Sequence, residues 1–264
     1  MRIASLVSRS VLLSALPFLL SSQDAARARQ SGYLTAAAMP DLIRVLPSAP
    51  EPGSGRDAAD RAIFKATRSL QDSPRWKLAQ SDDMLSVAAL LADFQCSMSL
   101  GAKPESAPVL VGMLARVSMD AGSATGPAKD FFHRKRPFLV DQGRVCIAIS
   151  PFFEKTFDYP SGHATLGWAV GLILAELEPD HATAILTRAR SFGESRVVCG
   201  VHNASAVEAG RTAGSALVAA LNGNAAFHLD LEKARAELAV LRAKPSSTGV
   251  GCASEMSLIA KSPY

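Results

Sequence analysis

The amino-acid sequence predicts an all-α protein whose helices form a single-domain helical bundle. From residue 57 onward, apolar residues recur at intervals of three and four, which is the period of an amphipathic helix. Runs in which β-branched or aromatic residues alternate with polar ones, as in strands, are few. Residues 164–175 carry no polar side chain apart from Thr165, which is typical of a helix buried in the middle of a bundle.

Boundary signals divide this pattern into separate helices. Ser81 stands with Asp82 and Asp83 before one apolar run, Pro179 opens another run, and Asn222 closes a third. The helices predicted in this way span residues 57–70, 82–99, 106–121, 125–133, 163–177, 180–192, 196–221 and 225–243.

These helices define one helical domain over residues 57–243, between irregular segments at 29–56 and 244–264. No internal repeat or long low-complexity linker divides the domain. The chain between Arg136 and Pro160 has no helical period, so we expect a long surface loop there. Loops of that length are uncommon unless they are functional.

Residues 1–28 have the layout of a secretory signal. Two arginines precede an apolar run over residues 11–20, and small residues then surround a cleavage point. The competing interpretation is a membrane anchor, which needs roughly 20 uninterrupted apolar residues. This run is about half that length and contains Pro17. We therefore expect a cleaved signal, a periplasmic or secreted mature protein, and no stable membrane insertion.

The charge balance argues against nucleic acid as a partner. The whole chain has a formal net charge of +4, and residues 1–28 account for three arginines and one aspartate of it. The remaining Lys and Arg residues are interspersed with acids and do not form a run, so neither a nucleic-acid surface nor a basic membrane patch is predicted.

Four cysteines follow the predicted signal, and an even number in an exported protein favours disulfides. Sequence alone does not choose among the three pairings that four thiols allow. The pairing we favour joins Cys146 to Cys199 and Cys96 to Cys252. The alternative is that the cysteines are buried free thiols, which pack as small apolar residues.

Three short polar clusters stand out against the apolar helical pattern. They are Lys129–Pro137, Pro160–His163 and Ser195–His202. Each has an ordinary structural interpretation when it is considered alone. The first is typical of a solvated basic face, the second of a Ser-capped helix start, and the third of a histidine that is hydrogen-bonded in the core.

The second cluster directly precedes the buried helix and has the features of an anion site. Free backbone N–H groups at a helix start, with the helix dipole behind them, attract anions. Gly162 permits close approach of a ligand, and Ser161 offers both a helix cap and a hydroxyl donor. His163 then lies at the mouth of this site.

Together the clusters supply what phosphoryl transfer requires. Lys129, Arg136 and Arg196 provide fixed cations for the phosphate oxygens, and the imidazoles of His163 and His202 suit a leaving-group acid and a nucleophile. Arg196 and His202 fall on one predicted helix but about 120° apart around its axis. The arginine side chain therefore has to curl toward the imidazole.

These motifs resemble those of the bacterial class A non-specific acid phosphatases, within the phosphatidic acid phosphatase type 2 and vanadium haloperoxidase group. The group's signature is Lys, six intervening residues and Arg-Pro, then Pro-Ser-Gly-His, then Ser-Arg, five intervening residues and His. Lys129 with Arg136-Pro137, Pro160–His163, and Ser195-Arg196 with His202 match it. The resemblance extends from about residue 33 to residue 243.

The resemblance implies a role for each matched residue. The catalytic residues are His202, the nucleophile that forms a phosphohistidine, and His163, the acid that protonates the leaving alkoxide. The phosphate-binding residues are Lys129, Arg136, Ser161, Gly162 and Arg196. No metal or other cofactor is implied, in agreement with a sequence that lacks HExxH and paired Cys ligands.

One position departs from the family pattern. The family has an Asp four residues after the nucleophilic histidine, where this chain has Ala206. That Asp orients the imidazole, so a different partner for His202 is required. The alternatives are Ser205, Glu208, a backbone carbonyl or a water molecule. We expect activity to be retained, because an orienting partner tunes the chemistry.

The predicted function is the hydrolysis of a broad range of small phosphate monoesters, with phosphoryl transfer to alcohols as a side reaction. Three alternatives stay open: a lipid or isoprenyl-diphosphate phosphatase, a vanadium-dependent haloperoxidase, and a phosphate-binding protein with weakened catalysis, which Ala206 favours. The loop over residues 138–159 is expected to select the leaving group. Self-association is common in the family, so we expect a homodimer.

Overall fold

The computed structural model describes residues 31–244 and 251–264, and the predicted signal over residues 1–28 lies outside the described part. The prediction of an all-α fold is confirmed, because the described residues form helices and no strand. The α-helices are α2 (Leu42–Val45), α3 (Gly55–Thr67), α4 (Pro74–Ser81), α5 (Val87–Met98), α6 (Pro108–Phe132), α7 (Pro151–Glu154), α8 (Gly162–Leu177), α9 (Ala182–Cys199), α10 (Ala204–Leu221), α11 (Ala225–Arg242) and α12 (Cys252–Ile259). Short 3-10 helices span Arg68–Leu70, Pro104–Ser106, Pro137–Leu139 and Pro179–His181.

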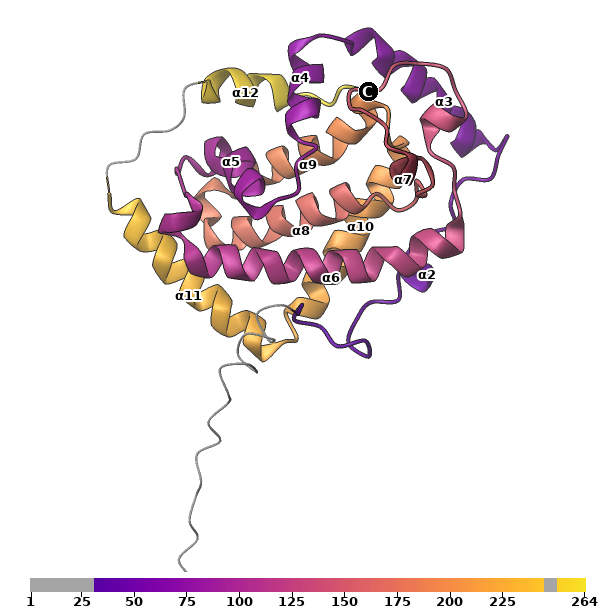
Figure 1. Cartoon of the computed structure of the whole chain (residues 1–264). Coiled ribbons are helices and arrows are strands. Elements are labelled where there is room, and N and C mark those ends of the chain that lie inside the picture. Colours follow the sequence, from indigo (N-terminus) through magenta and orange to yellow (C-terminus); the bar gives the residue numbers. More distant parts are fainter. Residues whose placement is uncertain (1–30, 245–250) are drawn as a thin grey trace, which may run out of the picture.

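Helix α8 forms the centre of the bundle, with the long α6 alongside it (Figure 1). It packs against α9, α10, α6 and α11. Glycines permit the closest of these approaches, since a Cβ at Gly171 would lie 2.3 Å from Cβ of Ala189 on α9. A Cβ at Gly214 on α10 would lie 2.7 Å from the carbonyl oxygen of Thr165. The apolar run over 164–175 is therefore largely buried, as its composition predicts, and only Trp168, Leu172 and Ala175 on one side of the helix are partly exposed.

Three predicted helix boundaries are wrong. The helix predicted over 82–99 begins at Val87 with Ser86 as its N-cap, and Asp82 is instead the C-cap of α4. The segments 106–121 and 125–133 belong to one helix, α6, which continues through Pro127. Proline there removes a hydrogen bond to the carbonyl of residue 123, but both residues face solvent, where water satisfies that carbonyl. Helix α9 likewise does not stop at residue 192. It ends at Cys199, where Gly200 adopts a left-handed conformation with φ 82°.

Four helices lie where none is predicted. The one-turn α2 falls in the segment over 29–56, and the one-turn α7 falls in the loop between Arg136 and Pro160. Helix α4 begins at Pro74 after Ser73, whose side chain accepts a hydrogen bond from the Trp76 N–H, a combination typical of a helix start. Helix α12 lies within the tail over 244–264, which the sequence analysis treats as irregular. It is attached to the body of the molecule by a disulfide.

The favoured disulfide pairing is confirmed. Cys96 of α5 is joined to Cys252 at the start of α12, with Cα atoms 5.1 Å apart. Cys146 in the loop after α6 is joined to Cys199 at the end of α9, with Cα atoms 4.6 Å apart. The second bond holds the long loop against the end of the helix that carries Arg196.

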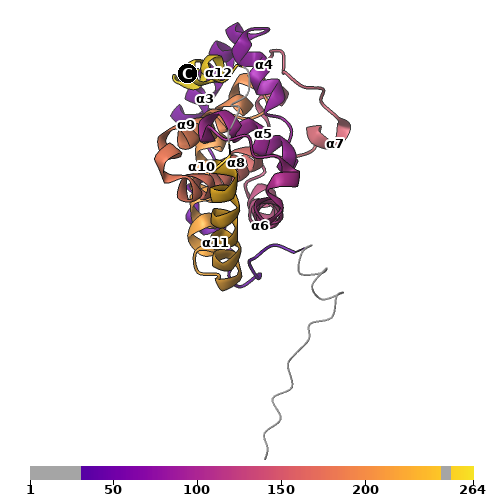
Figure 2. The same ribbon diagram turned by 90° about the vertical axis from the view of Figure 1, so that its left-hand side faces the viewer.

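The long loop between Arg136 and Pro160 exists as predicted and carries the short α7. In Figure 2 the part of this loop around α7 stands out from the bundle. Among the residues that the structure describes, no helix is both long and apolar enough to span a membrane.

Candidate active site

The predicted site residues lie at the ends of four helices. Lys129 is in the last turn of α6, and Arg136 follows that helix. Ser161 is the N-cap of α8, so that Gly162 and His163 form its first turn. Arg196 is in the last turn of α9, and His202 lies in the connection to α10. The prediction that Arg196 and His202 share one helix is wrong, because Gly200 ends α9 between them.

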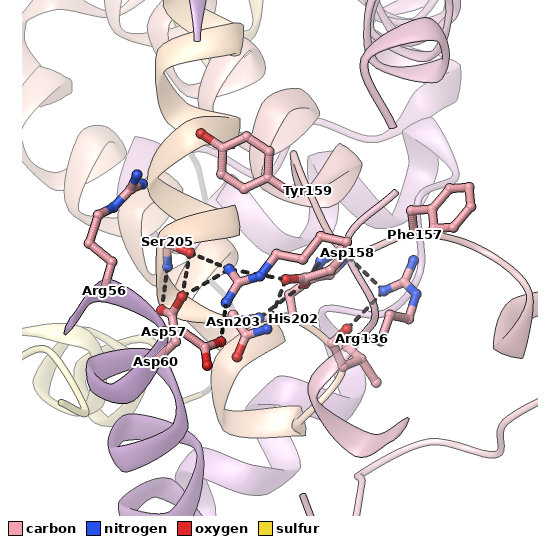
Figure 3. A network of polar contacts seen from close by, with 12 residues as sticks. Arg56, Asp57, Asp60, Arg136, Phe157, Asp158, Tyr159, His202, Asn203 and Ser205 are labelled. Carbon is pink, nitrogen blue, oxygen red and sulfur yellow. Dashed lines mark hydrogen bonds and ion pairs between the residues drawn. The ribbon is translucent and has the colours of Figure 1, made fainter. Parts of the chain in front are cut away.

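His202 is held at both ring nitrogens. Its Nδ1 lies 2.9 Å from Oδ1 of Asp158, and its Nε2 lies 2.9 Å from Nη1 of Arg136 (Figure 3). A guanidinium can only donate, so Nε2 must present its lone pair and Nδ1 must carry the proton. The imidazole is 3% exposed. Burial lowers its pKa well below the usual range, and Arg136 and Lys129 lower it further, which keeps the lone pair free.

Asp158, which no motif identifies, is the carboxylate in contact with Nδ1 of His202. Oδ1 of Asp158 also accepts a hydrogen bond from the Asn203 backbone N–H at 3.1 Å, and Oδ2 accepts one from Asn203 Nδ2 at 2.8 Å. Burial raises the pKa of Asp158, while Arg134 and the two Asn203 hydrogen bonds lower it. The signal that could have revealed it is an acidic residue just ahead of Pro160, in a loop already suspected of a function.

Arg196 has unused hydrogen-bonding capacity. Its side chain is fully buried and forms an ion pair with Asp83, with 2.8 Å between Nη2 and Oδ1. Its Nε and Nη1 have no hydrogen-bond acceptor among the described residues. Buried donors of this kind are expensive to leave unpaired, so they suit an anionic ligand. Asp83, which lies in the loop between α4 and α5, is a second residue that the sequence analysis does not identify.

His163 lies beside Asp83, the residue that also pairs with Arg196. Its Nε2 is 3.1 Å from the carbonyl oxygen of Asp83 and 3.8 Å from Oδ1 of that residue. Because a carbonyl oxygen only accepts, Nε2 of His163 carries a proton. Burial lowers the pKa of His163 well below its usual range, and Arg196 and His202 lower it further. A bound phosphate would oppose this effect by adding negative charge next to the ring.

Lys129 and Arg136 are both held by the loop over residues 138–159. Nζ of Lys129 donates to the carbonyl oxygen of Phe157 at 2.8 Å, and Nε of Arg136 donates to Oγ1 of Thr156 at 3.0 Å. The Arg136 guanidinium also lies over the Phe153 ring, 4.0 Å from its centroid. Burial and the nearby Arg136 lower the pKa of Lys129 to about 7. The second half of this loop therefore holds two of the predicted phosphate-binding cations.

Ser161 and Gly162 form the start of α8 beside these residues. The Ser161 hydroxyl accepts a hydrogen bond from the Ala164 N–H, and the Ser161 N–H donates to the Ala206 carbonyl at 2.9 Å. A Cβ at Gly162 would have a single neighbour, Oγ1 of Thr125 at 3.9 Å, so the protein itself does not need glycine there. The absence of a side chain leaves room for a ligand at the start of α8.

The structure thus brings five predicted side chains together. His202 is influenced electrostatically by Lys129, Arg136 and Arg196, and His163 by Arg196, Arg136 and His202. Three cations and two imidazoles share one buried location, with a helix start beside it. Within the described residues, no group of three or more His, Cys, Asp or Glu side chains could hold a metal ion.

Comparison with known proteins places this chain among phosphatases. The PAP2 superfamily pattern matches residues 107–225. An acid phosphatase from Zymomonas mobilis subsp. mobilis is 41% identical over 199 residues, which cover 75% of each chain. A non-specific acid phosphatase from Providencia stuartii is 34% identical over 80% of this chain and 86% of its own. One from Salmonella typhimurium is 34% identical over 72% and 77%. With its helical fold, its three matched motifs and relatives of this similarity over most of its length, the chain belongs to the PAP2 superfamily, among the class A non-specific acid phosphatases.

Proposed function

We propose that the protein hydrolyses small phosphate monoesters through a phosphohistidine at Nε2 of His202. The observation that carries the proposal is the state of this imidazole: Nδ1 donates to Asp158, and the lone pair of Nε2 faces the cations. A neutral, oriented imidazole among three cations is suited to attack phosphorus.

The site residues account for both halves of the reaction. Lys129, Arg136 and Arg196, with the N–H groups at the start of α8, neutralise the phosphate oxygens. The Nε2 lone pair of His202 forms a bond to phosphorus while the bond to the ester oxygen breaks, and that oxygen takes a proton from His163. Water then attacks the phosphohistidine and gives a proton to His163. Inorganic phosphate leaves, and the His202 lone pair is restored.

The alternatives are distinguishable by assay. Ala206 is the feature that favours a phosphate-binding protein without catalysis. The hydrogen bond between Asp158 and His202 weighs against that interpretation, because His202 has a carboxylate partner although the family's Asp is missing at position 206. A haloperoxidase would oxidise bromide once vanadate is added. A lipid or isoprenyl-diphosphate phosphatase would prefer those substrates to soluble monoesters.

The direct test is a panel of phosphate monoesters and diphosphates assayed with the wild type, His202→Ala and His163→Ala. We expect both substitutions to reduce turnover strongly. His163→Ala should be partly spared with a good leaving group, because such a group needs less help from an acid. Wild-type turnover in His202→Ala, or bromide oxidation that rivals phosphate release, would contradict the proposal.

We also propose that the protein is exported to the periplasm or secreted. The pattern of residues 1–28 and the two disulfides support this location. Fractionation of the producing cells tests this location. If the signal is cleaved, the mature protein should begin near residue 29. Homodimer formation stays a prediction, which light scattering of the purified protein checks.

A further inference from the structure

The first turn of α10 shows how this chain departs from its family. Ala206, at the position of the family's Asp, is fully buried and belongs to an apolar cluster that also contains Tyr159. Tyr159 directly follows Asp158 in the sequence. Position 206 and the loop that carries Asp158 are therefore neighbours in space, although 48 residues separate them along the chain.

Asp158 is fixed in place by contacts on all sides. Its backbone N–H donates to the Arg134 carbonyl oxygen at 2.8 Å. Its Oδ2 lies 3.6 Å from Nη1 of Arg134, and both of its oxygens accept from Asn203. Its side chain is fully buried. These contacts fix the orientation in which Oδ1 of Asp158 meets the ring of His202.

Arg134 is itself held by a second set of contacts. Its Nη1 donates to Oγ of Ser205 at 2.6 Å and lies 2.9 Å from Oδ2 of Asp60. Asp60 in turn accepts hydrogen bonds from the backbone N–H and the hydroxyl of Ser205. Ser205, one of the residues considered as a partner for His202, is therefore engaged with Asp60 and Arg134 instead.

We propose that Asp158 is the positioning carboxylate of His202 and that it replaces the Asp missing at position 206. The carboxylate comes from the loop before Pro160 instead of from the first turn of α10. This inference rests on the proposed function for its kinetic consequences, but its structural part, the control of the His202 tautomer, does not depend on catalysis.

The proposal predicts that positions 158 and 206 compensate for each other. Asp158→Ala leaves Nδ1 of His202 without an acceptor. Once a bound phosphate takes the place of the imidazole as acceptor for Arg136, the proton is then free to move to Nε2 and occupy the nucleophilic lone pair. Ala206→Asp in the wild-type background places a second carboxylate in the same buried location, where like charges disfavour one another. The double variant Asp158→Ala/Ala206→Asp has one carboxylate again and is expected to recover.

The experiment compares the full-length mature protein as wild type, the two single variants and the double variant. kcat and kcat/KM are measured against pH, and thermal unfolding monitors the fold. Nitrogen-15 NMR reports the tautomer of His202 in the presence of inorganic phosphate, which takes Arg136 away from Nε2. We expect Asp158→Ala to lower kcat by about 100-fold or more with a smaller change in KM. The double variant should regain at least about ten-fold in kcat, together with the wild-type pH profile and the Nδ1–H tautomer.

Two further variants separate positioning from folding. Asp158→Asn keeps an oxygen acceptor in the same shape but removes the charge, so it should fold and show an intermediate kcat. Asp120→Ala removes another buried carboxylate, one that accepts hydrogen bonds from the backbone N–H groups of Tyr33 and Leu34 and does not contact the site. It should lower the melting temperature and leave kcat unchanged.

The outcomes distinguish the inference from the proposed function. If the folded Asp158→Ala and Asp158→Asn variants retain wild-type kcat, pH profile and tautomer, the inference is wrong. A folded double variant without recovery of the tautomer contradicts the exchange between the two positions. If the wild type releases no phosphate while the tautomer still depends on Asp158, the proposed function fails and the inference stands.

Discussion

Nη1 of Arg136 donates a hydrogen bond to Nε2 of His202 over 2.9 Å and another to the Val201 carbonyl oxygen over 2.8 Å. The guanidinium thus lies on the lone pair from which attack on phosphorus is expected. A phosphate that enters the site must take the place of the imidazole as the acceptor for Arg136. The same contact that keeps the nucleophile unprotonated in the free protein becomes a contact to substrate oxygen.

Arg136→Lys tests this dual role. Lysine keeps a positive charge but cannot donate from several nitrogens at once, as Arg136 does to Thr156, Val201 and His202. We expect kcat/KM to fall by about 10²–10³-fold, the range for loss of one fixed donor to a developing charge. Steady-state kinetics with a soluble monoester measure the effect. Wild-type kcat/KM in a folded Arg136→Lys protein would show that charge alone suffices.

The alkaline side of the pH profile should depend on Lys129. Its pKa is lowered to about 7, so it loses its proton as the pH rises through that value, and one cation is lost from the phosphate site. Because kcat/KM reports ionisation of the free enzyme, we expect it to decline above pH 7. Lys129→Arg should move the decline to higher pH, since a guanidinium stays charged. An unchanged profile in Lys129→Arg would assign the decline to another group.

Asp83 should compete with the substrate for Arg196. Its carboxylate pairs with the Arg196 guanidinium at 2.8 Å, so a phosphate has to displace it. Asp83→Asn removes the charge and keeps the backbone carbonyl that contacts His163. We expect KM and the inhibition constant of inorganic phosphate to fall roughly five-fold, the equivalent of about 1 kcal/mol.

A rise in KM would mean that Asp83 instead orients Arg196 for the substrate. The matched control is Asp72→Asn, which removes an exposed carboxylate that pairs with Arg144 in an outer loop. It should leave both constants unchanged, because neither residue contacts the site residues.

The buried imidazoles should make the fold less stable in acid. The pKa values of His163 and His202 are lowered in the folded state, while an unfolded chain has the ordinary value of about 6.5. As the pH falls below about 6.5, the unfolded chain binds protons that the folded chain does not, so the free energy of unfolding decreases. Thermal unfolding between neutral and acidic pH measures how steeply the free energy of unfolding falls with pH, and His163→Asn should reduce this dependence.

The exposed His228 offers the control for this slope. His228→Asn should leave the dependence on pH as in the wild type. Inorganic phosphate should oppose the loss of stability in acid, because an anion favours the charged imidazoles. If His163→Asn and the wild type lose stability equally, other groups dominate the acid response.

The fold was predictable because its main signals are local. The apolar run after His163 identifies the buried α8, and its lack of a polar face is enough to place it in the centre. Helix ends were less predictable. The polar pair Ser195-Arg196 resembles a helix boundary, but both side chains are buried within α9, where Asp82 and Asp83 pair with them. Tertiary partners decide such cases, and the sequence pattern does not contain them.

The candidate site was also predictable only in part. The residues that motifs identify lie at the ends of helices, and the structure places them together. The motifs do not identify Asp158 and Asp83, because each contacts a residue far away in the sequence. Asp158 contacts His202, and Asp83 contacts Arg196. Ala206 indicated that a carboxylate was missing, but it did not indicate which loop supplies the replacement.

The most direct measurement is rapid acid-free quenching of the enzyme during turnover of a monoester with labelled phosphate, followed by peptide mapping under alkaline conditions, which preserve phosphohistidine. If His202 is the nucleophile, the peptide that contains it becomes labelled faster than phosphate is released, and His202→Ala carries no label. Turnover without label on that peptide, or label on another residue, would contradict this role.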